Sequence, residues 1–137
     1  MITALDTNIL SVIWSGGSEA PDVAASLSRA SEEGALIICG PVYAELLAYP
    51  RATADFVGTF LADTRIAVEF DMHKDIWTEA GCRFGEYSKR RRRSGAGEPK
   101  RLLIDFLVGG HALHRADRLY TLDASRYRRD FPELELL

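Results

Sequence analysis

Two aspartates follow apolar runs that the sequence pattern predicts to be strands. Asp6 comes directly after residues 2–5, and Asp123 comes after residues 119–122. In open parallel sheets, binding sites form outside the carboxyl ends of the strands. Each aspartate taken alone is an equally good turn or helix-capping residue. Together they place two carboxylates where a site is expected.

Two further acids lie on predicted helices with apolar surroundings. Asp105 interrupts the apolar stretch 102–108, and Glu45 lies about one turn into a helix predicted over 41–49. An ionised carboxylate buried without a partner is costly, so Asp105 requires one. A neighbouring arginine, the helix N-terminus or a metal ion would each serve. Glu45 by itself is more typical of a solvated helix surface.

A divalent cation is the partner that would neutralise all four carboxylates together, because hard cations prefer oxygen ligands. Repulsion among free carboxylates raises some of their pKa values, and metal binding relieves that repulsion. At such a site Mg²⁺, or alternatively Mn²⁺, activates water and stabilises the charge that develops on a phosphate ester. The acidic residues therefore predict metal-assisted hydrolysis of phosphodiesters.

Four short segments containing these acids follow one another in a characteristic order. They are LDTNIL at 5–10, VYAEL at 42–46, LIDFL at 103–107 and YTLD at 120–123. Together they resemble the PIN-domain ribonucleases, and among these the VapC-like toxins of type II toxin–antitoxin systems. The resemblance implies an α/β fold, a PIN-like three-layer α/β/α sandwich with a mostly parallel central sheet of four to five strands. It extends over nearly the whole chain, so we expect a single domain over 1–137.

The resemblance also implies roles for individual residues. Asp6 and Asp105 would be the principal metal ligands, and Glu45 and Asp123 would complete the acidic site directly or through water. Thr121 matches a hydroxyl position that orients water or the carboxylates. The implied activity is a Mg²⁺-dependent endoribonuclease that inhibits translation by cleaving tRNA or rRNA. The implied partners are a cognate VapB-like antitoxin that blocks the site and a second copy in a homodimer.

Asn8 matches a polar position of the family, although capping of the following helix is an equally good role for it. Two other functions remain as alternatives. A catalytically silent PIN-like RNA-binding or scaffold module would be favoured by loss of a site acid, but all four are present. An aspartyl-phosphate enzyme using Asp6 as nucleophile usually has a second aspartate two residues later, where this chain has Asn8.

Five consecutive cations at 89–93 are followed by Lys100 and Arg101, beyond a Gly-rich segment at 94–99 that is predicted to be a loop. An acidic centre repels a polyanion, so a nuclease needs a basic rim. The residues that we assign to RNA binding are Arg90, Arg91, Arg92, Arg93, Lys100 and Arg101. The run is also consistent with a solvated helix end, whose cations suit the helix dipole, or with a contact to an acidic antitoxin segment.

Short apolar runs alternate with helical patterns, which favours parallel strands joined by crossover helices. Strands are predicted at 2–5, 36–39, 65–70, 119–122 and, as a short terminal one, 134–136. Helices are predicted at 20–33, 41–49, 54–63, 73–92 and 102–115. Ser18 and Thr53 are the predicted N-caps of two of these helices. Trp14 and Trp77 fit core positions better than base-stacking ones, because no basic residues interleave with them.

Composition excludes several classes of protein. The net charge of −3 divides into −7 over residues 1–75 and +4 over residues 76–137, so a uniformly basic coating protein is excluded. With 47% hydrophobic and 27% charged residues the chain is typical of globular proteins. Two cysteines suit neither a disulfide framework nor a zinc site, and His111 with His114 lacks a third ligand. We expect a cytoplasmic protein without a signal peptide or membrane contact.

Overall fold

Four short strands form the centre of the computed structural model, which describes residues 1–97 and 101–137. They are β1 (Ile2–Leu5), β2 (Ala35–Cys39), β3 (Ile66–Glu69) and β4 (Arg118–Tyr120). All pairings are parallel, in the order β3-β2-β1-β4. The strands are short and rich in buried apolar residues, as expected for parallel strands covered on both faces.

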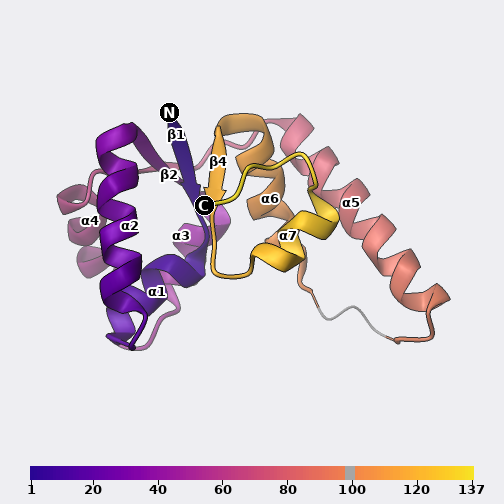
Figure 1. Cartoon of the computed structure of the whole chain (residues 1–137), viewed down its shortest axis with the longest axis horizontal. Coiled ribbons are helices and arrows are strands. Elements are labelled where there is room, and N and C mark those ends of the chain that lie inside the picture. Colours follow the sequence, from indigo (N-terminus) through magenta and orange to yellow (C-terminus); the bar gives the residue numbers. More distant parts are fainter. Residues whose placement is uncertain (98–100) are drawn as a thin grey trace.

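Within the described residues, six helices connect the strands and a seventh follows β4. They are α1 (Thr7–Ser15), α2 (Ala20–Glu33), α3 (Gly40–Leu47), α4 (Ala54–Asp63), α5 (Lys74–Arg93), α6 (Leu103–Arg115) and α7 (Ala124–Asp130). Helices α2 and α4 lie on one side of the strands and α5 and α6 on the other, giving three layers (Figure 1). The predicted α/β/α sandwich is therefore confirmed, with four strands in its sheet.

The strand order changes direction beside β1. The chain passes from β1 to β2 and on to β3 in one direction, and then returns so that β4 pairs with the opposite edge of β1. Such a reversal opens a crevice outside the carboxyl ends of the two strands, where ligands bind in open α/β sheets. This is where Asp6 and the residues after β4 lie.

Helix boundaries follow local signals with few exceptions. The hydroxyl of Thr53 accepts a hydrogen bond from the backbone N–H of Phe56 at 3.1 Å, so its predicted capping role is confirmed. The predicted cap Ser18 is wrong, because α2 begins after Glu19, whose side chain makes no capping bond. Helix α1 ends at Gly16, whose φ of 67° is the left-handed conformation that glycine adopts without strain.

The sequence pattern missed two helices and extended three strands too far: 65–70 and 119–122 run past the ends of β3 and β4, and 134–136 is not a strand. Helices α1 and α7 follow Asp6 and Asp123 directly and are only 9 and 7 residues long, too short for a clear helical period. The predicted terminal strand is reduced to one bridge between Leu136 and Leu119. The backbone N–H of Leu119 donates to Glu135 at 2.9 Å, so the chain end still lies along β4.

The two tryptophans differ in their surroundings. Trp14 packs edge-on against three aromatic rings, those of Tyr49, Phe56 and Phe60, with ring centroids 5.2 to 5.4 Å apart. Trp77 is 52% exposed, so the prediction that it belongs to the core is wrong. Its indole N–H donates to the carbonyl of Met72 at 3.0 Å, which holds the ring along the start of α5.

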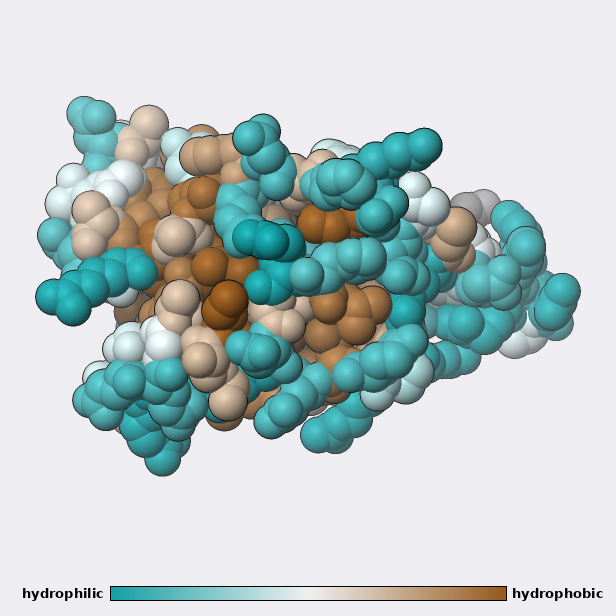
Figure 2. Space-filling view, turned by 90° about the horizontal axis from the view of Figure 1, so that it is seen from above, coloured by the Kyte–Doolittle hydropathy of each residue, from teal (hydrophilic) through white to brown (hydrophobic). Residues whose placement is uncertain are grey.

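The outer surface mixes apolar and polar side chains. Seen from above, at the edge where β1 and β4 begin, hydrophobic residues show between hydrophilic ones (Figure 2). Within the described ranges, no helix combines the length and the apolar character needed to cross a membrane.

Candidate acidic site at the carboxyl ends of β1 and β4

Asp6 lies at the centre of the candidate site. Its backbone N–H donates to the carbonyl of Tyr120 at 3.0 Å, which places it between the ends of β1 and β4. One carboxylate oxygen, Oδ1, accepts from the backbone N–H of Thr7 at 2.8 Å and caps α1. The other, Oδ2, accepts from the buried hydroxyl of Thr121 at 2.8 Å. The carboxylate is therefore held by both of its oxygens and is only 8% exposed.

Asn8 joins the two aspartates that end the strands. Its side-chain Nδ2 lies 3.3 Å from Asp6 Oδ2 and 3.5 Å from Asp123 Oδ2. Its Oδ1 accepts from the backbone N–H of Leu122 at 3.2 Å. The helix-capping role considered for Asn8 is wrong, because Asp6 caps α1 and Asn8 lies inside its first turn. Asn8 instead bridges the loop after β4 to α1.

Thr121 and Asp123 form the β4 side of the site. The Thr121 hydroxyl, which donates to Asp6, also accepts from the backbone N–H of Asp123 at 3.0 Å. Asp123 occupies the N-cap position of α7, but its side chain makes no capping bond. Its exposed carboxylate therefore stays available at the rim of the site.

Glu45 reaches the site from the other side through Thr7. It lies in α3, which begins directly after β2, and its Oε1 accepts from the Thr7 hydroxyl at 2.6 Å. Because Thr7 also donates its backbone N–H to Asp6, one residue connects the two acids. Glu45 is half-buried here, so it does not stand on a freely solvated helix surface.

Asp105 lies in the first turn of α6. Its Oδ2 accepts from the backbone N–H of Leu102 at 3.2 Å and lies 3.6 Å from Nε of Arg101. Both conventional partners considered for this carboxylate, a helix N-terminus and an arginine, are therefore present. Asp105 is also close enough to Asp6 for its charge to raise the pKa of that carboxyl.

The electrostatics of the site are set by burial. Burial is the main cause that raises the pKa of Asp6 above its usual value, and Asp105 adds to it, while hydrogen bonds from Thr121 and Thr7 oppose it. The phenol of Tyr127 lies beside Asp6. Burial and the charges of Asp6 and Asp105 raise its pKa, so it stays protonated. Its buried hydroxyl lowers the pKa of Asp6, although no hydrogen bond of regular geometry joins it to a described residue.

These residues suit a hard divalent cation by their chemistry. Asp6, Glu45, Asp105 and Asp123 all supply oxygen, and among the described residues no basic side chain forms an ion pair with Asp6. As the side chains lie, no three His, Cys, Asp or Glu residues of the described ranges are close enough together to form a ligand set. Water or a side-chain rotation would therefore have to complete the coordination.

The structure divides the predicted RNA-binding residues into several groups. Arg90 pairs with Asp130, and Arg91 donates to the carbonyl of Ala96 at 2.6 Å. Arg92 and Arg93 are exposed at the end of α5. The prediction for Lys100 falls outside the described residues.

The assignment of Arg101 to the basic surface is corrected, because its side chain is 5% exposed. Its Nη1 donates to Asp130 Oδ2 at 2.5 Å. The guanidinium lies over the rings of Phe106 and Tyr127, at 4.8 and 5.0 Å from their centroids. Asp130 lies on α7, a helix too short to recognise from the sequence. No sequence signal therefore pointed to its pairing with Arg101.

The two histidines lie in different surroundings, His111 in the core and His114 at the surface. Buried His111 lies 3.4 Å from Oε2 of Glu69, and burial lowers the pKa of its imidazole below the usual value. His114 lies 3.4 Å from Oε1 of Glu79. Neither histidine belongs to the acidic site.

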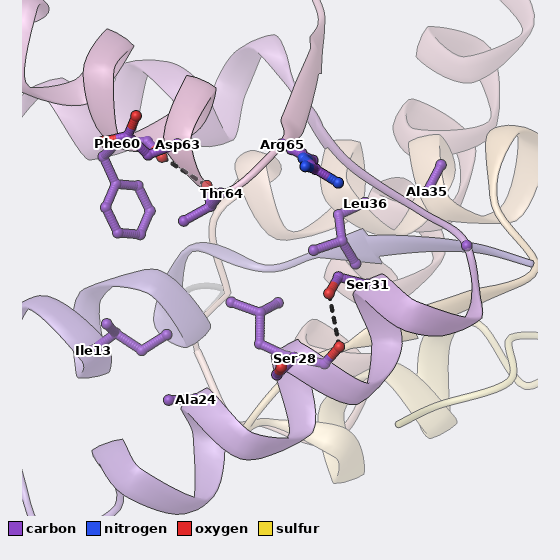
Figure 3. A pocket seen from close by; sticks show the side chains of 12 residues that line it. Ile13, Ala24, Ser28, Ser31, Ala35, Leu36, Phe60, Asp63, Thr64 and Arg65 are labelled. Carbon is purple, nitrogen blue, oxygen red and sulfur yellow. Dashed lines mark hydrogen bonds between the residues drawn. The ribbon is translucent and has the colours of Figure 1, made fainter.

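A separate groove of about 740 Å³ lies between α2, α4 and the start of β2 (Figure 3). Leu27, Leu36 and Phe60 contribute its apolar surface, and Ser31 and Arg65 are among its polar residues. None of the four candidate acids lines this groove.

The chain shares its fold with known toxin–antitoxin structures. VapBC2 from Rickettsia felis, bound to a DNA fragment from their promoter, matches with 22% identity and a TM-score of 0.63, over 100% of this chain and 98% of the other. VapBC-1 from nontypeable Haemophilus influenzae matches with 21% identity and a TM-score of 0.68, over 100% and 97%. A toxin–antitoxin complex from Klebsiella pneumoniae matches with 21% identity and a TM-score of 0.63, over 97% and 95%.

At this level of identity the likeness shows the fold, and the PIN-like arrangement predicted from the sequence is confirmed. No protein-family model matches the chain, and no curated protein matches its sequence.

Proposed function

We propose that this protein is a metal-dependent endoribonuclease that acts as the toxin of a VapBC-type toxin–antitoxin pair. One observation carries the proposal: three other acids, from separate segments, are connected to Asp6 where the strand order reverses. Thr7 links Glu45 to Asp6, and Asn8 links Asp123 to it. Asp105 is close enough to affect the pKa of Asp6.

Asp6 and Asp105 would hold Mg²⁺ or Mn²⁺, with Glu45 and Asp123 completing the ligands directly or through water. Bound there, the cation would lower the pKa of water and stabilise negative charge on the phosphate. The chain's own groups fix the geometry: the Thr121 hydroxyl and the Asn8 amide keep the Asp6 carboxylate turned into the site. The phenol of Tyr127 keeps its proton, so it can donate a hydrogen bond but cannot act as a general base.

The proposed partners follow from the resemblance and from the fold neighbours, which are toxin–antitoxin complexes. We propose a VapB-like antitoxin as the protein partner, an assembly through a homodimer, and tRNA or rRNA as the substrate. Cleavage of either RNA would inhibit translation.

The test is cleavage of bulk tRNA and rRNA by the purified chain with Mg²⁺, with Mn²⁺ and with chelator. We expect cleavage with either metal, none with chelator, and at least a hundredfold loss in D6N and D105N. D71N, which neutralises an exposed aspartate outside the site, is the matched control and should cleave normally. Cleavage that survives chelator and both site substitutions would end the proposal. RNA binding without any cleavage would instead identify a silent PIN-like binding module.

A further inference from the structure

Helix α7 carries a row of arginines that the sequence pattern did not single out. Arg126, Arg128 and Arg129 are exposed, and none forms an ion pair with a residue in the described part of the chain. The acid of the same helix, Asp130, has a side chain only 2% exposed and is occupied by Arg90 and Arg101. Between Ala124 and Asp130 the outer surface is therefore positive without a compensating negative group.

The helix that carries these arginines is firmly anchored. Tyr127 and Phe131 are buried beneath it, and their rings lie 6.3 Å apart. Arg101 donates to the carbonyl of Arg126 at 3.2 Å from below. Because the backbone is held in this way, the three exposed arginine side chains extend from fixed Cα positions. This reduces the conformational entropy lost when they bind a ligand.

The position of α7 relates these arginines to the acidic site and to α5. The helix begins directly after Asp123 and spans about 10 Å. At its other end, Asp130 pairs with Arg90 of α5, so α7 is tied to the last turns of that helix. Figure 1 shows α7 lying between the ends of β1 and β4 and the long helix α5.

We infer that Arg126, Arg128 and Arg129, called here the α7 surface, bind the phosphate backbone of an RNA strand beside the acidic site. This inference rests on the proposed nuclease function. Arginine presents a planar fork of donors that matches phosphate oxygens, and its charge offsets the repulsion between a polyanion and the site acids. A strand held along α7 leads directly to Asp123, within a few nucleotides of the carboxylates.

The arginines of α7 differ from the cationic run of α5 in how many of them are engaged within the protein. Arg90 and Arg91 are already engaged within the protein, whereas the α7 arginines lie nearer to Asp123 in the chain and carry no ion pair among the described residues. We therefore expect α7 to contribute more to RNA binding than Arg90 and Arg91 do. The end of α5 would contact only the more distant part of the strand.

The test compares R126Q/R128Q/R129Q with R29Q/R65Q/K74Q, which removes three positive charges elsewhere. Binding of a short, fluorescently labelled single-stranded RNA is measured by anisotropy in chelator, at several salt concentrations. For three contacts to a single strand, we expect the slope of log affinity against log salt to become shallower by about 2 in the α7 variant. The control variant should keep the wild-type slope. With Mg²⁺, the α7 variant should show a raised KM and a kcat close to wild type.

Each outcome bears on one proposal or the other. Normal RNA affinity and salt slope in the α7 variant, with cleavage retained, would overturn the inference and leave the nuclease function intact. RNA binding that depends on α7 without any cleavage by wild type would overturn the nuclease function and leave the binding surface. Polyglutamate serves as a model of an acidic protein segment. If the α7 variant keeps RNA binding but loses binding to polyglutamate, the inference is overturned and the α7 surface binds an acidic protein segment instead. Circular dichroism melting confirms that each variant is folded.

Discussion

The guanidinium of Arg101 and the carboxylate of Asp130 form a salt bridge of 2.5 Å with side chains 5% and 2% exposed. It joins the segment before α6 to the end of α7, and so connects the elements that carry Asp105 and Asp123. Removing one partner of such a pair leaves an unpaired buried charge. The consequences are testable without any assumption about function.

The first prediction concerns this salt bridge. Asp130→Ala should lower the free energy of unfolding by about 3–5 kcal/mol, because it removes the closest counter-charge of the buried Arg101 guanidinium and leaves only the longer contact to Asp105. Equilibrium unfolding in urea measures the change. The double variant Arg101→Met with Asp130→Leu should recover much of the loss, since it replaces the pair by apolar groups. An unchanged unfolding midpoint in Asp130→Ala would contradict the structural role.

The second prediction concerns metal binding to the folded state. Burial and the charge of Asp105 raise the pKa of Asp6, so its ionised form destabilises the fold and a bound cation should relieve that cost. Mg²⁺ or Mn²⁺ at a hundredfold excess over its dissociation constant should add about 2.7 kcal/mol of stability. Thermal melting with and without metal measures this. Asp6→Asn should respond little and Asp71→Asn fully; equal responses from both would argue against this site.

The third prediction concerns two glycines in helices. A Cβ at Gly109 would lie 2.3 Å from the ring of Phe131, whereas a Cβ at Gly81 of α5 would meet nothing within 4 Å. Gly81→Ala should therefore stabilise the protein by roughly 1 kcal/mol through helix propensity. Gly109→Ala should destabilise it by about 1–3 kcal/mol through overpacking, despite the same gain in propensity. Urea unfolding of both variants tests the contrast, and a stabilised Gly109→Ala would contradict it.

The fourth prediction concerns acid stability. Arg83 binds both oxygens of Glu133, at 2.8 and 2.9 Å, and lowers the pKa of that carboxyl from 4.5 to about 2. A lowered pKa stabilises the fold above pH 4.5, and this contribution disappears as the pH falls from 4.5 through 2. Because Glu133 is 54% exposed, solvent screening limits the effect to about 0.5–1 kcal/mol.

The measurement is the unfolding free energy of wild type and Glu133→Gln across that pH range. The variant should be less stable at pH 7, and the difference should vanish near pH 2. Glu86→Gln, which removes a looser surface pair with Lys89 at 3.4 Å, is the comparison and should have a smaller effect. A difference that grows at low pH would contradict the assignment.

Sequence patterns were reliable where a residue's environment depends on its neighbours along the chain. The predicted ranges 20–33 and 54–63 coincide with α2 and α4, and 2–5 coincides with β1. These segments combine a clear apolar period with turn or cap signals, which act locally. The short helix α7 had no such period, so neither the helix nor the exposure of its arginines could be predicted.

The sequence by itself determined the four acids, their order and their places after strands and near the starts of helices, because strand ends and helix starts are local properties. Only the tertiary structure decided how they connect: Thr7 to Glu45, and Asn8 to Asp123, across separations of 38 and 115 residues. It also decided that Arg101 lies buried against Asp130 while Arg126, Arg128 and Arg129 stay exposed. An arginine has the same charge in every segment; its availability to a ligand depends on which acids the packed helices bring within reach.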